Sequence, residues 1–274
     1  MSLDPALLSQ AGRFAILRAA RRIWAVGAVH GDAARLRALH MAFMDRLSEG
    51  DRVVYLGNYL GIGPQVRETL AELIRFRRWF LSMPPYMDPS DIVHLRGAQE
   101  EMWQKLLQLQ FANKPMEVLD WMLERGLGAT LQAYDSSAEE ARAVTAQGTQ
   151  ALTQWTGLLR DRMRSRPGHD ALFSSLKRAA VADTGAVLLV SAGLDESKTL
   201  DRQNDALWWA GRSFAAISKP YAGYRKVLRG YDPDHGGYRE TDATITLDGG
   251  CGFGGPLMAL CMTPGGDLLD RIAV

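Results

Sequence analysis

Three short apolar runs, each ending at a glycine and separated by helical patterns, constrain the fold of this chain more than any other feature. The runs are 23–26, 53–56 and 92–95, and the segments 32–47 and 65–80 between them carry apolar residues at helical spacing. Short apolar strands joined by crossover helices favour a parallel α/β sheet. Because ligands bind at the carboxyl edge of such sheets, the loops 27–31, 57–63 and 97–100 are expected to gather there.

Along the rest of the chain the expected secondary structure changes twice. Residues 3–22 have apolar positions at helical spacing and predict an amphipathic N-terminal helix. Residues 100–180 are poor in strand signals and predict several helices. Strands are then expected at 186–190, 226–228, 244–247 and 257–262, and the Gly- and Pro-containing turns between the later ones favour antiparallel hairpins.

Composition narrows the class of protein. The 274 residues are 47% hydrophobic and 23% charged with a net charge of +1, which is ordinary for a globular protein and indicates no nucleic-acid or membrane partner. No apolar run approaches a membrane span, and no signal peptide is recognisable. Cys251 and Cys261 form neither a disulfide framework nor a zinc pattern, so we expect buried thiols in a cytoplasmic protein. The sequence leaves the oligomeric state open.

Five loops, taken in chain order, resemble the signature of calcineurin-like metallophosphoesterases. That signature runs GDxHG, GDxxDRG, GNHE, HAGL and GH, and this chain has GAVHG at 27–31, GNYLGIGP at 57–64, RGAQE at 96–100, SAGL at 191–194 and GY at 230–231. The segment 121–134 and the glycine-rich segment 247–255 are similar to the bacterial serine/threonine protein phosphatase branch. The resemblance covers roughly residues 22–270.

The resemblance implies a fold. It predicts an α/β, four-layer sandwich of two mixed β-sheets flanked by helices, formed by a single domain over 1–274. A helical cap would be inserted at about 101–180, over the carboxyl edge of the strands.

The same resemblance implies that the metal site has been lost. Working members hold two metals with carboxylate, histidine and asparagine ligands. The six positions that match those ligands here are Ala28, His30, Asn58, Ala98, Ser191 and Tyr231. Of these, only His30 keeps the ligand of the family, and Gln99 replaces the histidine that protonates the leaving group. We therefore predict no metal, no cofactor and no catalytic residue, and a vestigial pocket formed by these seven residues.

The polar residues that remain have competing interpretations. Arg96 matches a phosphate-contacting arginine of the family, so it is either an anion-binding residue or the partner of Glu100 or Asp248. His30 is interpreted as a hydrogen-bonded structural histidine rather than a ligand of a single metal. Tyr231 either fills the space that the metals occupy in the family or lines a pocket.

The sequence supports one leading hypothesis and two alternatives. The first is a catalytically inactive, metal-free phosphatase homologue, a pseudophosphatase that binds a phosphorylated ligand or a protein partner. The second is a residual or altered metal-dependent phosphoesterase that uses one metal at His30 and Asn58. The third is a purely structural interaction module whose pocket is filled by its own side chains.

Overall fold

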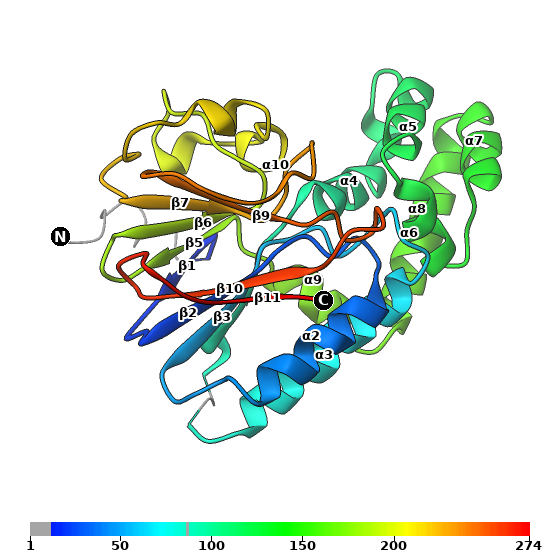
Figure 1. Ribbon diagram of the computed structural model, residues 1–274. Helices are drawn as coiled ribbons and strands as arrows, with labels where there is room; N and C mark the ends of the chain where they lie inside the picture. Colours follow the sequence, from blue (N-terminus) through cyan, green and yellow to red (C-terminus); the bar gives the residue numbers. More distant parts are fainter. Residues whose placement is uncertain (1–11, 86–87) are drawn as a thin grey trace.

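Two β-sheets pack face to face, with helices on the outer face of each (Figure 1). The computed structural model describes residues 12–85 and 88–274. The first sheet has the strand order β1-β5-β6-β7-β9-β8 and the second β11-β10-β2-β3-β4. The strands are β1 Phe14–Leu17, β2 Arg22–Val26, β3 Asp51–Tyr55, β4 Ile92–His94, β5 Ala179–Ala182, β6 Val187–Val190, β7 Lys226–Arg229, β8 Gly237–Glu240, β9 Thr244–Asp248, β10 Met258–Met262 and β11 Leu268–Ala273.

The five-stranded sheet contains the parallel unit that the sequence predicts. Strand β2 pairs in parallel with β3, and β3 in parallel with β4, so that Trp24 lies opposite Val53 and Val53 opposite Ile92. Strand β10 joins the other side of β2 in antiparallel orientation and also pairs with β11. The glycine loops after β2, β3 and β4 therefore emerge at one edge, as expected for a parallel unit.

The six-stranded sheet is also mixed. Strands β6, β7 and β9 run parallel to one another, whereas β5 is antiparallel to β6 and β8 is antiparallel to β9. The predicted antiparallel hairpins between 226–228, 244–247 and 257–262 are wrong, because β7 and β9 pair in parallel and β9 and β10 lie in different sheets. The antiparallel pairs β8–β9 and β10–β11 each include a strand that the sequence did not predict. The chain between β7 and β9 forms β8 at the edge, so β9 returns beside β7 in the parallel sense.

The apolar residues form three layers of core. The layer between the sheets includes Leu17, Ile23, Val54, Leu189 and Leu247. A second layer joins the five-stranded sheet to α2 and α3 and continues into the later helices. The third lies on the outer face of the six-stranded sheet, around Leu207, Trp208 and Phe214. This arrangement is the predicted four-layer sandwich of two mixed sheets.

The helices follow the predicted pattern. Helix α2 (Ala33–Met44) begins at Asp32, whose carboxylate accepts a hydrogen bond from the Arg35 N–H as a helix N-cap. Helices α4 to α9 occupy most of the region expected to form the helical cap, and α5 to α8 lie at one end of the molecule (Figure 1). The remaining helices are α3 Val66–Ser82, α4 Ala98–Leu106, α5 Pro115–Leu123, α6 Leu127–Ala133, α7 Ala138–Ala146, α8 Thr149–Ser165, α9 His169–Ser175 and α10 Ala206–Trp209, and the 3₁₀ segments are η1 Pro89–Asp91, η2 Leu109–Phe111, η3 Leu200–Arg202 and η4 Ser213–Ala216.

The predicted helix over 3–22 is wrong where it can be compared. Residues 3–11 lie outside the described part of the chain, and Phe14–Leu17 form β1, which pairs in parallel with β5. Ala15 and Leu17 enter the core between the sheets, whereas Phe14 enters the outer core. This alternation has period two, and pairing with β5 overrides the helical spacing of the sequence.

No helix in 12–85 or 88–274 is both long enough and apolar enough to cross a membrane.

Candidate functional site

Backbone hydrogen bonds join the predicted loops at the carboxyl edge of the strands. The N–H groups of Val29 and His30 both donate to the carbonyl of Asn58, at 3.1 and 2.7 Å. The Ala28 N–H donates to the Gly230 carbonyl at 2.9 Å and so ties the two sheets together. The structure thus brings together loops that are up to 200 residues apart in the chain.

Three non-glycine residues in these loops have left-handed backbone conformations. They are His30, Asn58 and Ile62, with φ of 50°, 57° and 58°. Each such residue costs on the order of 1 kcal/mol, and strain of this kind concentrates at functional sites. All three residues also line one cavity. The surrounding fold therefore holds these loops in a conformation that they do not favour on their own.

Glu100 fixes the loop after β3. Its buried carboxylate accepts hydrogen bonds from the N–H groups of Asn58, Tyr59 and Leu60 at 2.8, 2.8 and 3.1 Å. It also accepts one from Gly97 at 2.8 Å. Burial raises the pKa of Glu100, and these four bonds oppose the shift by stabilising the carboxylate. From the sequence, Glu100 is considered as a possible partner of Arg96, which misses this role.

A cavity of about 760 Å³, which we call the loop cavity, opens between these loops, α5 and the segment after α10. Five of the predicted vestigial-pocket residues line it: His30, Asn58, Ala98, Gln99 and Tyr231. Ala28 and Ser191 do not line it. Ser191 is buried, its hydroxyl has no hydrogen-bond partner in the described part of the chain, and its carbonyl accepts from the N–H groups of Gly230 and Tyr231.

His30 is the most unusual of these residues. Neither ring nitrogen has a hydrogen-bond partner of normal geometry among the described residues, so the predicted hydrogen-bonded histidine is not what the structure contains. The ring instead makes edge contacts with Tyr231 and Phe253, with centroids at 5.5 and 5.3 Å. Burial, aided by electrostatic repulsion from the nearby His235, lowers the pKa of His30 to about 3, although the Leu60 backbone opposes the shift. The imidazole is therefore neutral at physiological pH.

Gln99 and Asn58 link the loops to the helical cap. The Gln99 side-chain amide donates to the Arg125 carbonyl at 2.7 Å, and its backbone N–H donates to Asn58 Oδ1 at 3.1 Å. Asn58 Nδ2 is buried without a partner among the described residues. Gln99 is thus a connector between a loop and the cap, at the position where the resemblance expects a proton donor.

Arg96 does not lie with these residues. Its guanidinium pairs with Glu101 at 3.2 Å, rather than with Glu100 or Asp248, and it does not line the loop cavity. Its carbonyl accepts from the indole N–H of Trp208 at 2.8 Å. The side chain is held at Glu101, outside the lining of the loop cavity.

The cations of the loop cavity are two arginines that the sequence did not single out. Arg125 follows α5 and stacks on the Trp121 ring, with its guanidinium carbon 4.4 Å from the ring centroid. Arg212 follows α10, is exposed, and makes no ion pair in the described part of the chain. Trp121 and Trp209 meet edge to face at 5.3 Å across the two segments. The cavity therefore combines two cations with a pair of indoles and one carboxylate, that of Glu124, which lies 3.7 Å from the Arg125 guanidinium.

His235 also lies on the cavity wall. Its Nδ1 lies 2.9 Å from Oδ2 of Asp248. The same oxygen accepts a hydrogen bond from the Asp232 N–H, and Oδ1 of Asp248 accepts one from the Gly250 N–H. Asp248 is thus turned toward His235 and the turn rather than into the cavity. Cys251 is no nucleophile for this pair, because its thiol donates to the Val29 carbonyl and burial raises its pKa to about 12.

The donor groups do not fit the two-metal centre that the resemblance implies. No group of three or more His, Cys, Asp or Glu residues within 12–85 and 88–274 is placed to hold a metal ion. Two adjacent dications need anionic ligands, and alanines stand at two of the six expected positions.

Comparison with known proteins gives a fold but no sequence family. No protein-family model matches the chain, and no curated protein matches it. Among solved structures, a provisionally assigned diadenosine tetraphosphatase is 20% identical over 96% of this chain and 97% of its own, with a TM-score of 0.57. A serine/threonine phosphatase from Saccharomyces cerevisiae is 14% identical over 98% and 87%, with a TM-score of 0.52.

This chain has the metallophosphoesterase fold. The metallophosphoesterase fold places the five loops where the resemblance expects them, at the carboxyl edge of the strands. Identities of 20% and 14% carry the architecture to this chain and nothing about its reaction.

Proposed function

We propose that this protein is a metal-free, catalytically inactive phosphatase homologue that binds a phosphorylated ligand in the loop cavity. The observation that carries the proposal is the combination of an open cavity with an unsuitable donor set. The cavity keeps about 760 Å³, but the described residues offer no three-donor group for a metal. Gln99 stands at the position where the resemblance expects a proton donor, and its side-chain amide already donates a hydrogen bond to the Arg125 carbonyl.

The chemistry of the wall supports a phosphorylated ligand. Arg125 and Arg212 supply guanidinium groups, which bind phosphate oxygens by charge-assisted, bidentate hydrogen bonds without a metal. Trp121 and Trp209 are partly exposed and offer flat apolar surface beside these cations. A cavity of this size fits a drug-sized or nucleotide-sized molecule.

Metal analysis and calorimetry test this function together. Protein purified without chelator should contain no stoichiometric Mn, Fe or Zn and should not hydrolyse p-nitrophenyl phosphate. Titration with phosphate, nucleotides and a phosphopeptide should give binding that the Arg125→Ala and Arg212→Ala variants weaken. Arg96→Ala is the matched control: weaker binding in this variant would restore Arg96 as the anion-binding residue. A full equivalent of metal together with hydrolysis would overturn the proposal.

One alternative has its own support. His30 has two unpartnered ring nitrogens beside Asn58, and the His235–Asp248 pair can act as an acid–base group. These groups favour a residual metal-dependent phosphoesterase. In that case hydrolysis should appear on addition of Mn²⁺ and disappear in His30→Ala.

A further inference from the structure

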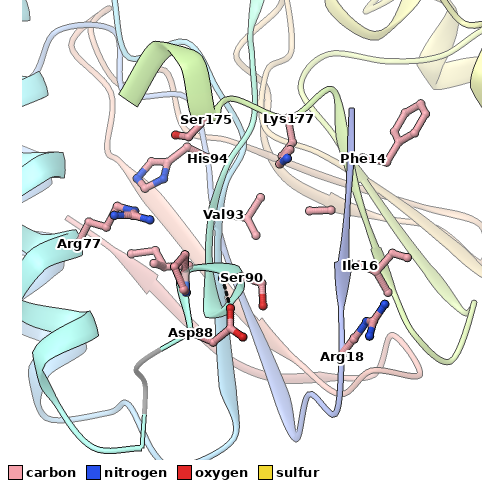
Figure 2. A pocket seen from close by; sticks show the side chains of 13 residues that line it. Phe14, Ile16, Arg18, Arg77, Asp88, Ser90, Val93, His94, Ser175 and Lys177 are labelled. Carbon is pink, nitrogen blue, oxygen red and sulfur yellow. Dashed lines mark hydrogen bonds between the residues drawn. The ribbon is translucent and has the colours of Figure 1, made fainter. Parts of the chain in front are cut away.

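A second cavity, of about 580 Å³, lies where the two sheets diverge, and we call it the edge cavity (Figure 2). Strands β1 and β4, the edge strands of the two sheets, form its floor and one wall. One end is closed by Lys177, whose N–H donates to the His94 carbonyl at 2.9 Å and whose carbonyl accepts from the Arg96 N–H at 2.7 Å. The edge cavity shares no lining residue with the loop cavity.

Three cations surround the edge cavity. Arg18 follows β1, Arg77 lies on α3, and Lys177 precedes β5, and Figure 2 shows them on different sides of the hollow. Neither arginine side chain makes a hydrogen bond or ion pair with another described residue, and the Lys177 ammonium donates only to the Gly12 carbonyl. The one carboxylate on the wall, Asp88, accepts a hydrogen bond from the Ser90 N–H at 2.8 Å. The cavity therefore has an excess of positive charge and guanidinium donors without partners.

A buried histidine lies in the wall of the same cavity. His94 is 3% exposed, stacks flat on the Tyr55 ring at 4.9 Å, and lies beside Arg77 in Figure 2. Its Nε2 is buried and has no hydrogen-bond partner among the described residues. Nε2 is closed off from the cavity as well as from solvent, so the ring packs behind the wall and is not a donor to a ligand. Burial, followed by the charges of Arg77 and His40, lowers the pKa of His94 to about 3, so it adds no positive charge to the wall.

The rest of the lining is apolar. Phe14 and Ile16 come from β1, Ile92 and Val93 from β4, and Pro89 from η1. The side chains of Phe14, Ile92 and Val93 are largely withdrawn from solvent. Ile16 and Pro89 are more exposed and form the accessible apolar part of the wall, which suits a ring or a short chain, whereas the three cations suit a multivalent anion.

We propose that the edge cavity is a second binding site, for an organic phosphate that has an apolar body. Arg77, Arg18 and Lys177 would share the phosphate oxygens, and the apolar body would lie against Ile16 and Pro89. Phosphate fits better than carboxylate because its charge approaches −2 near neutral pH and it offers three terminal oxygens to donors on different sides. This site is independent of the function proposed for the loop cavity.

Isothermal titration calorimetry with phenyl phosphate as the probe tests the site. The Arg125→Ala, Arg212→Ala double variant serves as the background, so that binding in the loop cavity does not contribute. In this background phenyl phosphate should bind, and adding Arg77→Ala should raise Kd at least about tenfold. Arg78→Ala changes the neighbouring arginine, which does not line the edge cavity, and should leave Kd within about twofold.

Each further outcome decides a part of the proposal. Thermal unfolding of Arg77→Ala checks that the variant is folded, and Lys177→Ala should weaken binding as a second, independent substitution. Inorganic phosphate should bind more weakly than phenyl phosphate, and equal affinity would remove the apolar body from the proposal. No binding in the background variant, or equal losses in Arg77→Ala and Arg78→Ala, would overturn the site altogether.

Discussion

Glu100 is the residue on which the geometry of the loop cavity most directly depends. Its carboxylate accepts four backbone N–H groups, three of them from consecutive residues after β3. A bond between a charged group and a backbone N–H contributes more than a neutral one, and an N–H left unpaired in the interior is costly. In the described part of the chain these three N–H groups have no acceptor other than Glu100.

Glu100→Gln should therefore destabilise the protein. The amide keeps one acceptor oxygen but turns an NH₂ group toward N–H donors, so the free energy of unfolding should fall by about 2–3 kcal/mol. Urea denaturation measures this loss. Glu117→Gln removes a carboxylate that is 69% exposed and should change stability by less than about 0.5 kcal/mol. Equal effects of the two substitutions would show that Glu100 does not organise the loop.

His94 should make stability depend on acidity. Its pKa is about 3 in the folded protein against 6.5 in the unfolded chain, because it is buried between Tyr55 and Tyr59 with Arg77 nearby. Below pH 6.5 the unfolded chain binds a proton that the folded protein does not, so stability falls as the pH drops from 6.5 toward 3. The slope from this one group is at most about 1.4 kcal/mol per pH unit.

Replacing the ring isolates that contribution. His94→Phe keeps the stack on Tyr55 and removes the titration, so its free energy of unfolding should fall less steeply between pH 6.5 and 4. The histidines His30, His40 and His169, whose pKa values burial also lowers, retain part of the slope in both proteins. Parallel curves for the two proteins would contradict the prediction.

At the scale of elements, the helical cap is fastened to the loop after β3 at a short stretch of backbone. The Ile62 N–H donates to the Gly126 carbonyl at 3.3 Å, and the Gly61 N–H donates to the Thr130 hydroxyl at 3.1 Å. Gly126 has φ of 93°, and a Cβ built there would lie 2.4 Å from the Ile62 side chain. The cap and the loop approach too closely for any larger residue.

Gly126→Ala should loosen the cap. Strain in the left-handed region and the clash with Ile62 should together cost about 1–2 kcal/mol, and hydrogen exchange of α5 and α6 should become faster. Gly128→Ala is the control, because this glycine lies within α6 at negative φ with nothing within 4 Å of its Cβ position. It should leave the protein equally stable or stabilise it by up to about 1 kcal/mol. Faster hydrogen exchange of α5 and α6 in Gly128→Ala but not in Gly126→Ala would contradict the prediction.

The elements differ in how far the sequence determines them. The strands β2, β3 and β4 are apolar runs followed by glycine, so their positions and parallel pairing can be predicted. Strands β8 and β11 were missed because they are largely exposed edge strands and carry no apolar run. Strand β1 was mistaken for helix because its four residues gain strand geometry only by pairing with β5, more than 160 residues away.

The same limit applies to the site. His30, Asn58, Ala98, Gln99 and Tyr231 follow from loop order, because the carboxyl ends of the strands converge. Arg125, Arg212 and Trp209 depend on how the cap and the segment after α10 close over those loops, and no local pattern encodes that approach. Arg96 belongs to a loop of the site, but its direction is decided by the ion pair with Glu101.

At the scale of the whole molecule, contacts within the protein join the two sheets beside the loop cavity. A Cβ at Gly27 would lie 2.4 Å from the Leu247 carbonyl oxygen, and one at Gly230 would lie 2.4 Å from the Leu56 side chain. Glycine thus permits a direct approach of the sheets at the edge where working phosphatases of the resembling family hold their metals. The fold should therefore be complete without a metal ion.

Stability should accordingly be independent of divalent metal. A ligand that binds the native state raises stability in proportion to the logarithm of its concentration over Kd, so a protein with no site should keep its Tm within about 1 °C in chelator or Mn²⁺. A variant introduces the five ligands that the resemblance expects, by Ala28→Asp, Asn58→Asp, Ala98→Asn, Ser191→His and Tyr231→His. Because the loops are still held in place, Mn²⁺ should raise the Tm of this variant. A drop in Tm of the unaltered protein on chelation would show instead that a metal is part of this molecule, and the loop cavity would then have to be understood as a working metal site.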